Sequence, residues 1–169
     1  MLRSYNIEWV LDRARYILAR HIKQMEKESR KLQLFRAGGA DYAVPNDVVM
    51  TIADWRQPAA LPHSPAAVLG VVSIRGRMLT VLDLTNLVGA ANDAQWNQIL
   101  ALRGDEQLAL AISKPGEVVE FPENEREEES KEGLVAQVLK HQGVDINILN
   151  VKQLFPTAIQ GRERRRRRF

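Results

Sequence analysis

The 169-residue sequence predicts a mainly β fold, in which two small barrels of about five strands each pack side by side behind an N-terminal helix. Three observations support this prediction. Apolar residues recur at helical spacing over residues 5–28, and from Lys31 onward the spacing changes toward two, with glycine-containing turns between the apolar runs. A short pattern also occurs twice, at 81–88 and again 67 positions later at 148–155.

The segment 5–28 is the first predicted element, an amphipathic helix that no glycine or proline interrupts. Its apolar residues recur every three or four positions, at Ile7, Val10, Leu11, Ala14, Ile17, Leu18, Ile22 and Met25. We expect this stripe to pack against the core of the domain. The alternative is that it docks onto a helix of a partner.

The first half of the β region should supply five strands, at residues 31–36, 42–44, 48–52 and the two arms of 68–84. Gly38-Gly39 turns the first hairpin, and residues 56–65, with three prolines, form a loop. In the second hairpin Gly76 supplies the positive φ of the turn and leaves Arg75 at the tip. That arginine either presents its charge to a partner or is simply solvated.

The second half repeats this organisation, with strands predicted at residues 98–102, 107–112, 117–121, 134–141 and 144–149. The acidic run 123–132 should be a solvated loop. In the repeated pattern Asp83 and Asn150 take the same place, each capping a short helix able to close one end of a barrel. Gly89 should end the first of these helices, and Pro156 should close the folded region.

Charge divides the chain unevenly. Residues 162–169 hold six arginines and one glutamate, a net charge of +5, so the whole-chain value of +3 leaves −2 for the remainder. We expect three parts: a helical extension at 1–30, one domain at 31–156, and a basic, disordered tail at 157–169. The tail is either a solvated end of the chain or a segment that binds nucleic acid or anionic lipid, with release of counterions.

The residue inventory predicts neither an enzyme nor a metal or cofactor site. There is no cysteine, which excludes disulfides and thiolate metal sites and fits a reducing cytoplasm. The three histidines stand at no metal-ligand spacing, and no nucleophile elbow or phosphate loop is present. The longest apolar run, 66–74, is too short to span a bilayer, and the N-terminus lacks a signal-peptide pattern.

The hairpin segment G-V-V-S-I-R-G-R-M-L-T-V-L-D-L, residues 70–84, resembles the signature G-V-x-N-L-R-G-x-x-x-P-V-x-D-L of the CheW-type coupling domains of bacterial chemosensory systems. The run K-L-Q-L-F-R-A-G-G-A-D-Y-A-V-P, residues 31–45, is similar to the first hairpin of that family, and residues 144–155 fit its last strand and helix. The resemblance covers about 31–156 and implies a fold of two small SH3-like barrels.

Such a resemblance implies a non-catalytic adaptor that couples methyl-accepting chemoreceptors to a CheA-type histidine kinase. The partners would be the regulatory domain of the kinase, the cytoplasmic hairpin tip of the receptors and other CheW-like domains, in arrays to which a cytoplasmic protein is recruited. The receptor hairpin would lie in a groove between the barrels. The positions that match partner-contacting positions of the family are Val49, Thr51, Gly70, Arg75, Ala109, Pro115 and Val118.

The sequence departs from the family pattern at three places. Ser73 replaces the usual asparagine, Thr80 replaces the usual proline, and residues 111–116 stand where the family commonly shows V-D-x-V. These departures, together with the arginine tail, leave two alternatives open. One is a divergent coupler of a non-flagellar array that has lost receptor binding, and the other is a nucleic-acid-binding protein that acts through its arginine tail.

Overall fold

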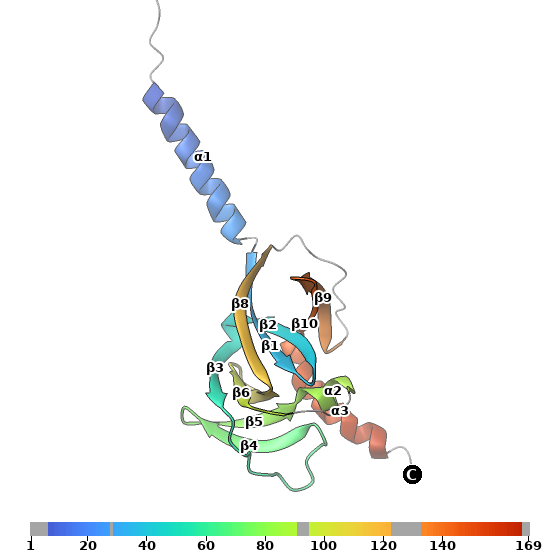
Figure 1. Ribbon diagram of the computed structural model, residues 1–169. Helices are drawn as coiled ribbons and strands as arrows, with labels where there is room; N and C mark the ends of the chain where they lie inside the picture. The colour runs from blue at the N-terminus through green and yellow to red at the C-terminus, as the bar shows by residue number, and fades with distance from the viewer. Residues whose placement is uncertain (1–6, 28, 91–94, 123–132, 167–169) are drawn as a thin grey trace, which may run out of the picture.

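A computed structural model describes residues 7–27, 29–90, 95–122 and 133–166, and its two five-stranded sheets and N-terminal helix confirm the predicted mainly β fold (Figure 1). The strands are β1 (Ser29–Ala37), β2 (Ala40–Pro45), β3 (Val49–Asp54), β4 (Val68–Ile74), β5 (Arg77–Asp83), β6 (Gln98–Leu102), β7 (Leu108–Ile112), β8 (Lys114–Pro122), β9 (Val135–His141) and β10 (Val144–Leu149). The helices are α1 (Ile7–Lys27), α2 (Leu84–Val88) and α3 (Leu154–Arg166), with 3-10 turns at Asn46–Val48 and Val151–Gln153.

The strands are ordered β8-β1-β2-β10-β9 in the first sheet, here called sheet A, and β3-β6-β7-β5-β4 in the second, sheet B. Each sheet holds one parallel pair, β2 with β10 and β5 with β7, among otherwise antiparallel neighbours. Among the described residues, the end strands of a sheet do not pair with each other. The expectation of closed barrels is therefore corrected to two open sheets.

The two sheets are built from exchanged halves of the chain. The hairpin β1–β2 joins three strands from the second half, and β6–β7 joins three strands from the first half, so the same order arises twice. The turns of the outer hairpins match in detail. Arg75-Gly76 has φ values of 48° and 74°, and Gln142-Gly143, 67 positions later, has 50° and 78°. The structure thus extends the short repeat seen in the sequence to whole halves.

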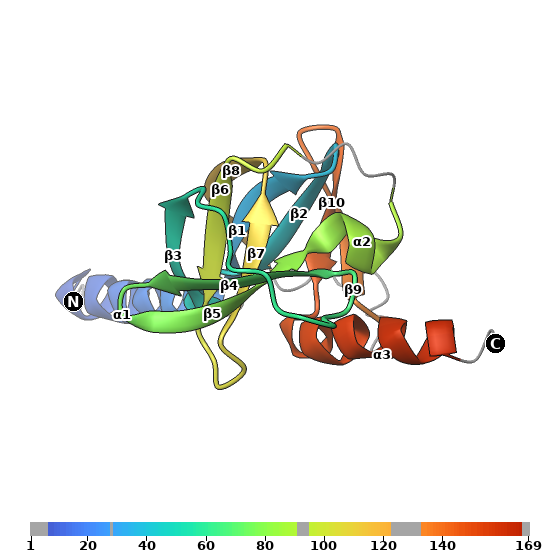
Figure 2. The ribbon, with the colours of Figure 1, turned by 90° about the horizontal axis from the view of Figure 1, so that it is seen from below.

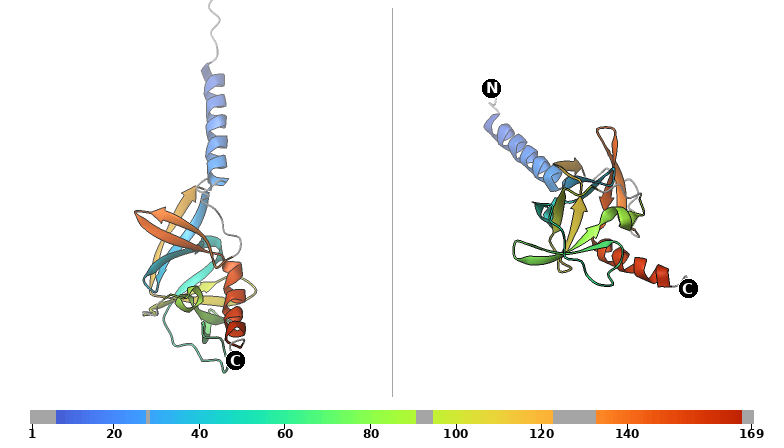
Figure 3. Two further views of the ribbon diagram at one scale, coloured as in Figure 1. Left: turned by 90° about the vertical axis from the view of Figure 1, so that its right-hand side faces the viewer. Right: turned by 60° about the horizontal axis from the view of Figure 1, so that its bottom comes forward.

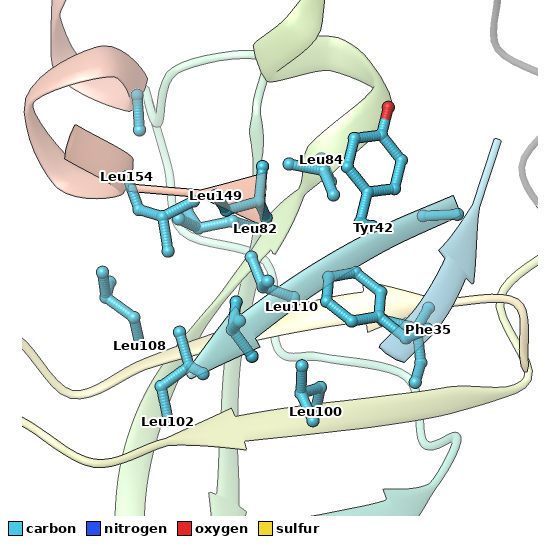
Figure 4. Packing of buried hydrophobic residues seen from close by; sticks show 14 residues of the cluster. Phe35, Tyr42, Leu82, Leu84, Leu100, Leu102, Leu108, Leu110, Leu149 and Leu154 are labelled. Atoms are coloured by element: carbon cyan, nitrogen blue, oxygen red, sulfur yellow. The ribbon is translucent and has the colours of Figure 1, made fainter. Parts of the chain in front are cut away.

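Three apolar layers hold the sheets together, because neighbouring residues of the central strands point to opposite faces. In β7, Leu108, Leu110 and Ile112 enter the layer between the two sheets, whereas Ala109 and Ala111 enter a layer on the other face of sheet B. A third layer lies within sheet A and contains Leu32, Ala43, Phe121, Leu139, Ile146 and Ile148. Figure 4 shows the central layer, with α3 contributing Leu154. Burial on both faces explains the nearly continuous apolar strands.

The helix α1 forms as predicted but does not pack against the core. It points away from both sheets in Figures 1 and 3, at the end of the molecule opposite α3. Its apolar side chains are exposed, from 72% at Ile7 to 51% at Ile22. The expectation of core packing is wrong because the sheets already cover their apolar faces with each other and with their own side chains.

Two details of the C-terminal region also differ from expectation. The side chain of Asp83 accepts hydrogen bonds from the backbone of α2 as predicted, but Asn150 makes no capping side-chain bond. Pro156 does not close the folded region, since it lies in the first turn of α3, where a missing N–H costs nothing, and Ala158 beyond it is buried. The predicted acidic loop 123–132 lies outside the described residues. The character of the arginine tail stays a prediction, because no side chain after Gln160 is described.

Candidate partner-binding surface

The seven positions singled out in the sequence do not form one surface. Figure 2 shows β3 and the β4–β5 hairpin of sheet B on one side of the molecule, with β9 and β10 on the other. Val49, Thr51 and Arg75 are exposed or half-buried on sheet B. Pro115 and Val118 lie on β8 of sheet A, and the remaining two positions are buried. The sequence therefore predicted parts of at least two separate surfaces.

The first surface joins β3 to the tip of the β4–β5 hairpin. Arg75, Arg77 and Arg103 surround a hollow of about 440 Å³ together with Met50 of β3. The Nε–H of Arg103 donates to the carbonyl oxygen of Val49 at 3.0 Å, so β3 and the end of β6 are tied together beside it. We call this feature the arginine hollow. The sequence indicated Arg75 but gave no sign that Arg77 and Arg103 would join it.

Gly70 and Ala109 present no side chain at the surface. An ideal Cβ on Gly70 would lie 2.3 Å from the carbonyl oxygen of Ala59, because the loop before β4 crosses directly over this residue. Ala109 is completely buried inside sheet B. Any effect of these two positions on a partner must therefore pass through the backbone and strands around them.

The second surface lies on β8. Val118 is 48% exposed, and Pro115 lines a hollow of about 550 Å³ that includes Arg36, Lys114 and Glu117. The buried amide of Gln33 donates to the carbonyl oxygens of Leu34 at 2.9 Å and Gly116 at 2.8 Å, which fixes β8 against the bulge in β1. This polar anchor beneath β8, whose exposed side chains include Lys114 and Glu117 beside Val118, gives the strand a defined register at the surface.

A third feature, the largest of the three hollows, lies between the sheets, where the family resemblance predicted a groove. Val49 and Thr51, which match groove-side positions of the family, do not line it. This inter-sheet hollow has a volume of about 780 Å³. Its lining mixes apolar residues with both signs of charge and includes Val48, Leu102, Leu149, Arg30, Arg103, Asp105, Glu106 and Lys152. Its members come from both halves of the chain, so no local motif could have identified them.

Within the described ranges, no three histidine, aspartate or glutamate side chains gather as a metal-holding group. Nor does any described helix have the length and apolar character needed to cross a membrane. The arrangement described above offers shaped surfaces and fixed charges for binding.

Comparisons with known proteins support the resemblance seen in the sequence. The model of the CheW-like domain matches residues 31–158. A protein described as "Probable chemotaxis protein CheW" from Rhizobium etli is 37% identical over 68 residues, which are 40% of this chain and 44% of that protein. Chemotaxis protein CheW of Rhizobium meliloti is 34% identical over 67 residues, covering 40% and 43% of the two chains. The chain thus spans less than half the length of these two curated relatives.

A longer alignment comes from chemotaxis protein CheW of Bacillus subtilis, which is 24% identical over 134 residues, 73% of this chain and 85% of that protein. Among solved structures, the scaffolding protein TtCheW from Thermoanaerobacter tengcongensis superposes with a TM-score of 0.67 at 20% identity, covering 75% of this chain and 92% of that one. This structural likeness shows a shared fold. With the family model matching most of its length, the chain belongs to the CheW-like domain family.

Proposed function

We propose that this protein is a non-catalytic scaffold of chemotaxis-type signalling that couples chemoreceptors to a CheA-type histidine kinase. The observation that carries the proposal is the match of residues 31–158 to the CheW-like domain. The curated relatives are named as chemotaxis proteins, and the structural relative is named as a scaffolding protein. A cytoplasmic location with recruitment to receptor arrays forms part of the same proposal.

The distribution of surfaces supports a scaffold because such a protein must hold two partners at once. The inter-sheet hollow has a volume of about 780 Å³, and its lining contains apolar, basic and acidic side chains. Such a surface suits a helical hairpin of the receptor, as in helix-in-groove recognition. The exposed part of β8, with Val118, lies on sheet A and offers a separate site for another small β domain. A kinase and a receptor can then bind without competing.

The test is a binding assay with the full chain and two immobilised partners encoded by the same genome. One is the cytoplasmic fragment of a chemoreceptor, and the other is the regulatory domain of the kinase. We expect each to retain the protein and the three components to form one complex. Lys152→Glu, at the inter-sheet hollow, should reduce receptor binding, whereas Lys140→Glu, an equally exposed position on β9, should leave it unchanged.

The outcomes separate this proposal from its alternatives. Retention by the kinase without any retention by the receptor would identify a coupler that has lost receptor binding. Retention by neither would refute the scaffold. A protein that instead binds DNA with a salt dependence that disappears on deletion of residues 162–169 would be a nucleic-acid-binding protein.

A further inference from the structure

The arginine hollow concentrates positive charge at one place on sheet B. Arg75 stands in the turn after β4, Arg77 begins β5, and Arg103 follows β6, yet all three line the same hollow with Met50. The lining comes from β3, from the turn between β4 and β5, from the start of β5 and from the residue after β6. The three charges therefore converge through the fold and not through the sequence.

These charges have no counterion on the part of the chain that the structure describes. None of the three guanidinium groups forms an ion pair there, although Arg103 is held by its bond to the carbonyl of Val49. No carboxylate lines the arginine hollow, and Asp105 and Glu106 line only the neighbouring inter-sheet hollow, which shares Arg103. Like charges repel one another, so an anion bound in the arginine hollow would reduce the repulsion among its three guanidinium groups. Residues 1–161 carry a net charge of −2, so the positive charge of this hollow is opposite in sign to the net charge of the sequence around it.

The backbone conformation of Arg75 is a second unusual feature of this site. Its φ of 48° is left-handed, a conformation that asparagine and glycine adopt more readily than arginine. The matching turn in sheet A places Gln142 there with a φ of 50°, so the hairpin geometry itself does not require a cation. The turn by itself therefore does not account for an arginine at this position.

The lining indicates the chemistry of that ligand. A guanidinium group binds a carboxylate through two parallel hydrogen bonds, and three of them suit a segment with more than one acidic side chain. Met50 packs on the apolar layer of sheet B and gives the hollow an apolar side. An acidic peptide can fill that side with an aliphatic residue. A nucleic acid cannot do so through its phosphates, and it is repelled by the negative body.

We propose that the arginine hollow binds an acidic segment of a partner protein, with carboxylates on Arg75, Arg77 and Arg103 and an apolar side chain against Met50. This inference rests on the proposed function, because a scaffold must have such a partner. The site itself is distinct from the inter-sheet hollow, with which it shares only Arg103.

The experiment uses the full chain and a synthetic peptide in which glutamates alternate with leucines. The side-chain Nε–Hε resonances of the arginines are followed by NMR during titration. We expect the peptide to shift the signals of the three arginines and to leave that of Arg56, outside the hollow, unchanged. Arg75→Asn, which suits the left-handed turn, and Arg77→Gln should each weaken binding roughly tenfold. Arg56→Gln is the matched control.

Three results would overturn the inference: no shift at these arginines, equal binding of a peptide with glutamine in place of glutamate, or preferential binding of a thymidine oligonucleotide to the same side chains. The assay contains no receptor or kinase, so its outcome is independent of the coupling assay. Peptide binding without receptor or kinase binding refutes the scaffold alone. Receptor binding that depends on Lys152 without peptide binding refutes the arginine hollow alone.

Discussion

Replacing Gly70 by alanine should destabilise the protein strongly, and the structure separates two causes. The residue has a φ of 144°, which strains any residue with a side chain, at a cost of about 1–3 kcal/mol. The new Cβ would also lie 2.3 Å from the carbonyl oxygen of Ala59 and 2.7 Å from its carbonyl carbon. These are backbone atoms, so the whole loop over β4 must move away.

That movement breaks the two hydrogen bonds between Ala59 and Val71, which measure 2.8 and 2.9 Å. At about 1 kcal/mol for each bond, the close approach adds roughly 2 kcal/mol to the cost of the backbone conformation. The total is about 3–5 kcal/mol. For a domain of this size we expect a fall in melting temperature of roughly 10–15 °C, measured by circular dichroism.

Gly104→Ala is the matched control, since Gly104 has a φ of 141° and open space where its Cβ would stand. It should lose only the conformational part, so its melting temperature should lie several degrees above that of Gly70→Ala. An equal fall in melting temperature in the two variants would refute the reasoning, because the close contact with Ala59 would then contribute nothing to the free energy of unfolding.

Three further perturbations test the architecture. Deleting residues 1–27 should change the free energy of unfolding by less than about 1 kcal/mol, because the described side chains of α1 are exposed; a larger loss would mean that the helix packs on the sheets. Leu110→Ala should cost about 3–4 kcal/mol in chemical denaturation, since Leu110 is fully buried between the sheets, whereas Val118→Ala on the exposed face of β8 should cost less than roughly 0.5 kcal/mol. Burial raises the pKa of Tyr42 above 10.0, so the unfolded chain ionises first and stability should fall as pH rises above about 10. Tyr42→Phe should remove this part of the alkaline loss, and an unchanged pH profile of the melting temperature would contradict that origin.

Local elements could be predicted from the sequence because their causes are local. The strand at 98–102 was predicted with its observed bounds, and the cap at Asp83 and the turn at Gly76 follow from residue types that suit those conformations. Period-two patterning also identified strands whose alternate residues enter different layers.

Features that depend on distant parts of the chain could not be predicted in this way. The apolar stripe of α1 is equally consistent with a buried helix and an exposed one, and only the completed sheets show that no face is left for it. Arg103 is separated from Arg75 by β5, α2 and β6, so their meeting beside Met50 depends on how the strands of sheet B are arranged. The burial of Gly70 likewise depends on the path of a loop that its own neighbours do not determine.

The exchange of hairpins between the two halves has a consequence for how the polypeptide can be divided. A fragment that ends before β6 contains three strands of sheet B but lacks β6 and β7, which lie between them. The remaining fragment contains three strands of sheet A but lacks β1 and β2, so neither of the two fragments can complete a sheet by itself. Cleavage in that connection should give two pieces that recover native structure only when mixed. A gene duplication also explains the pattern, since two copies of a single half could form the same pair of sheets as a domain-swapped dimer that exchanges this hairpin.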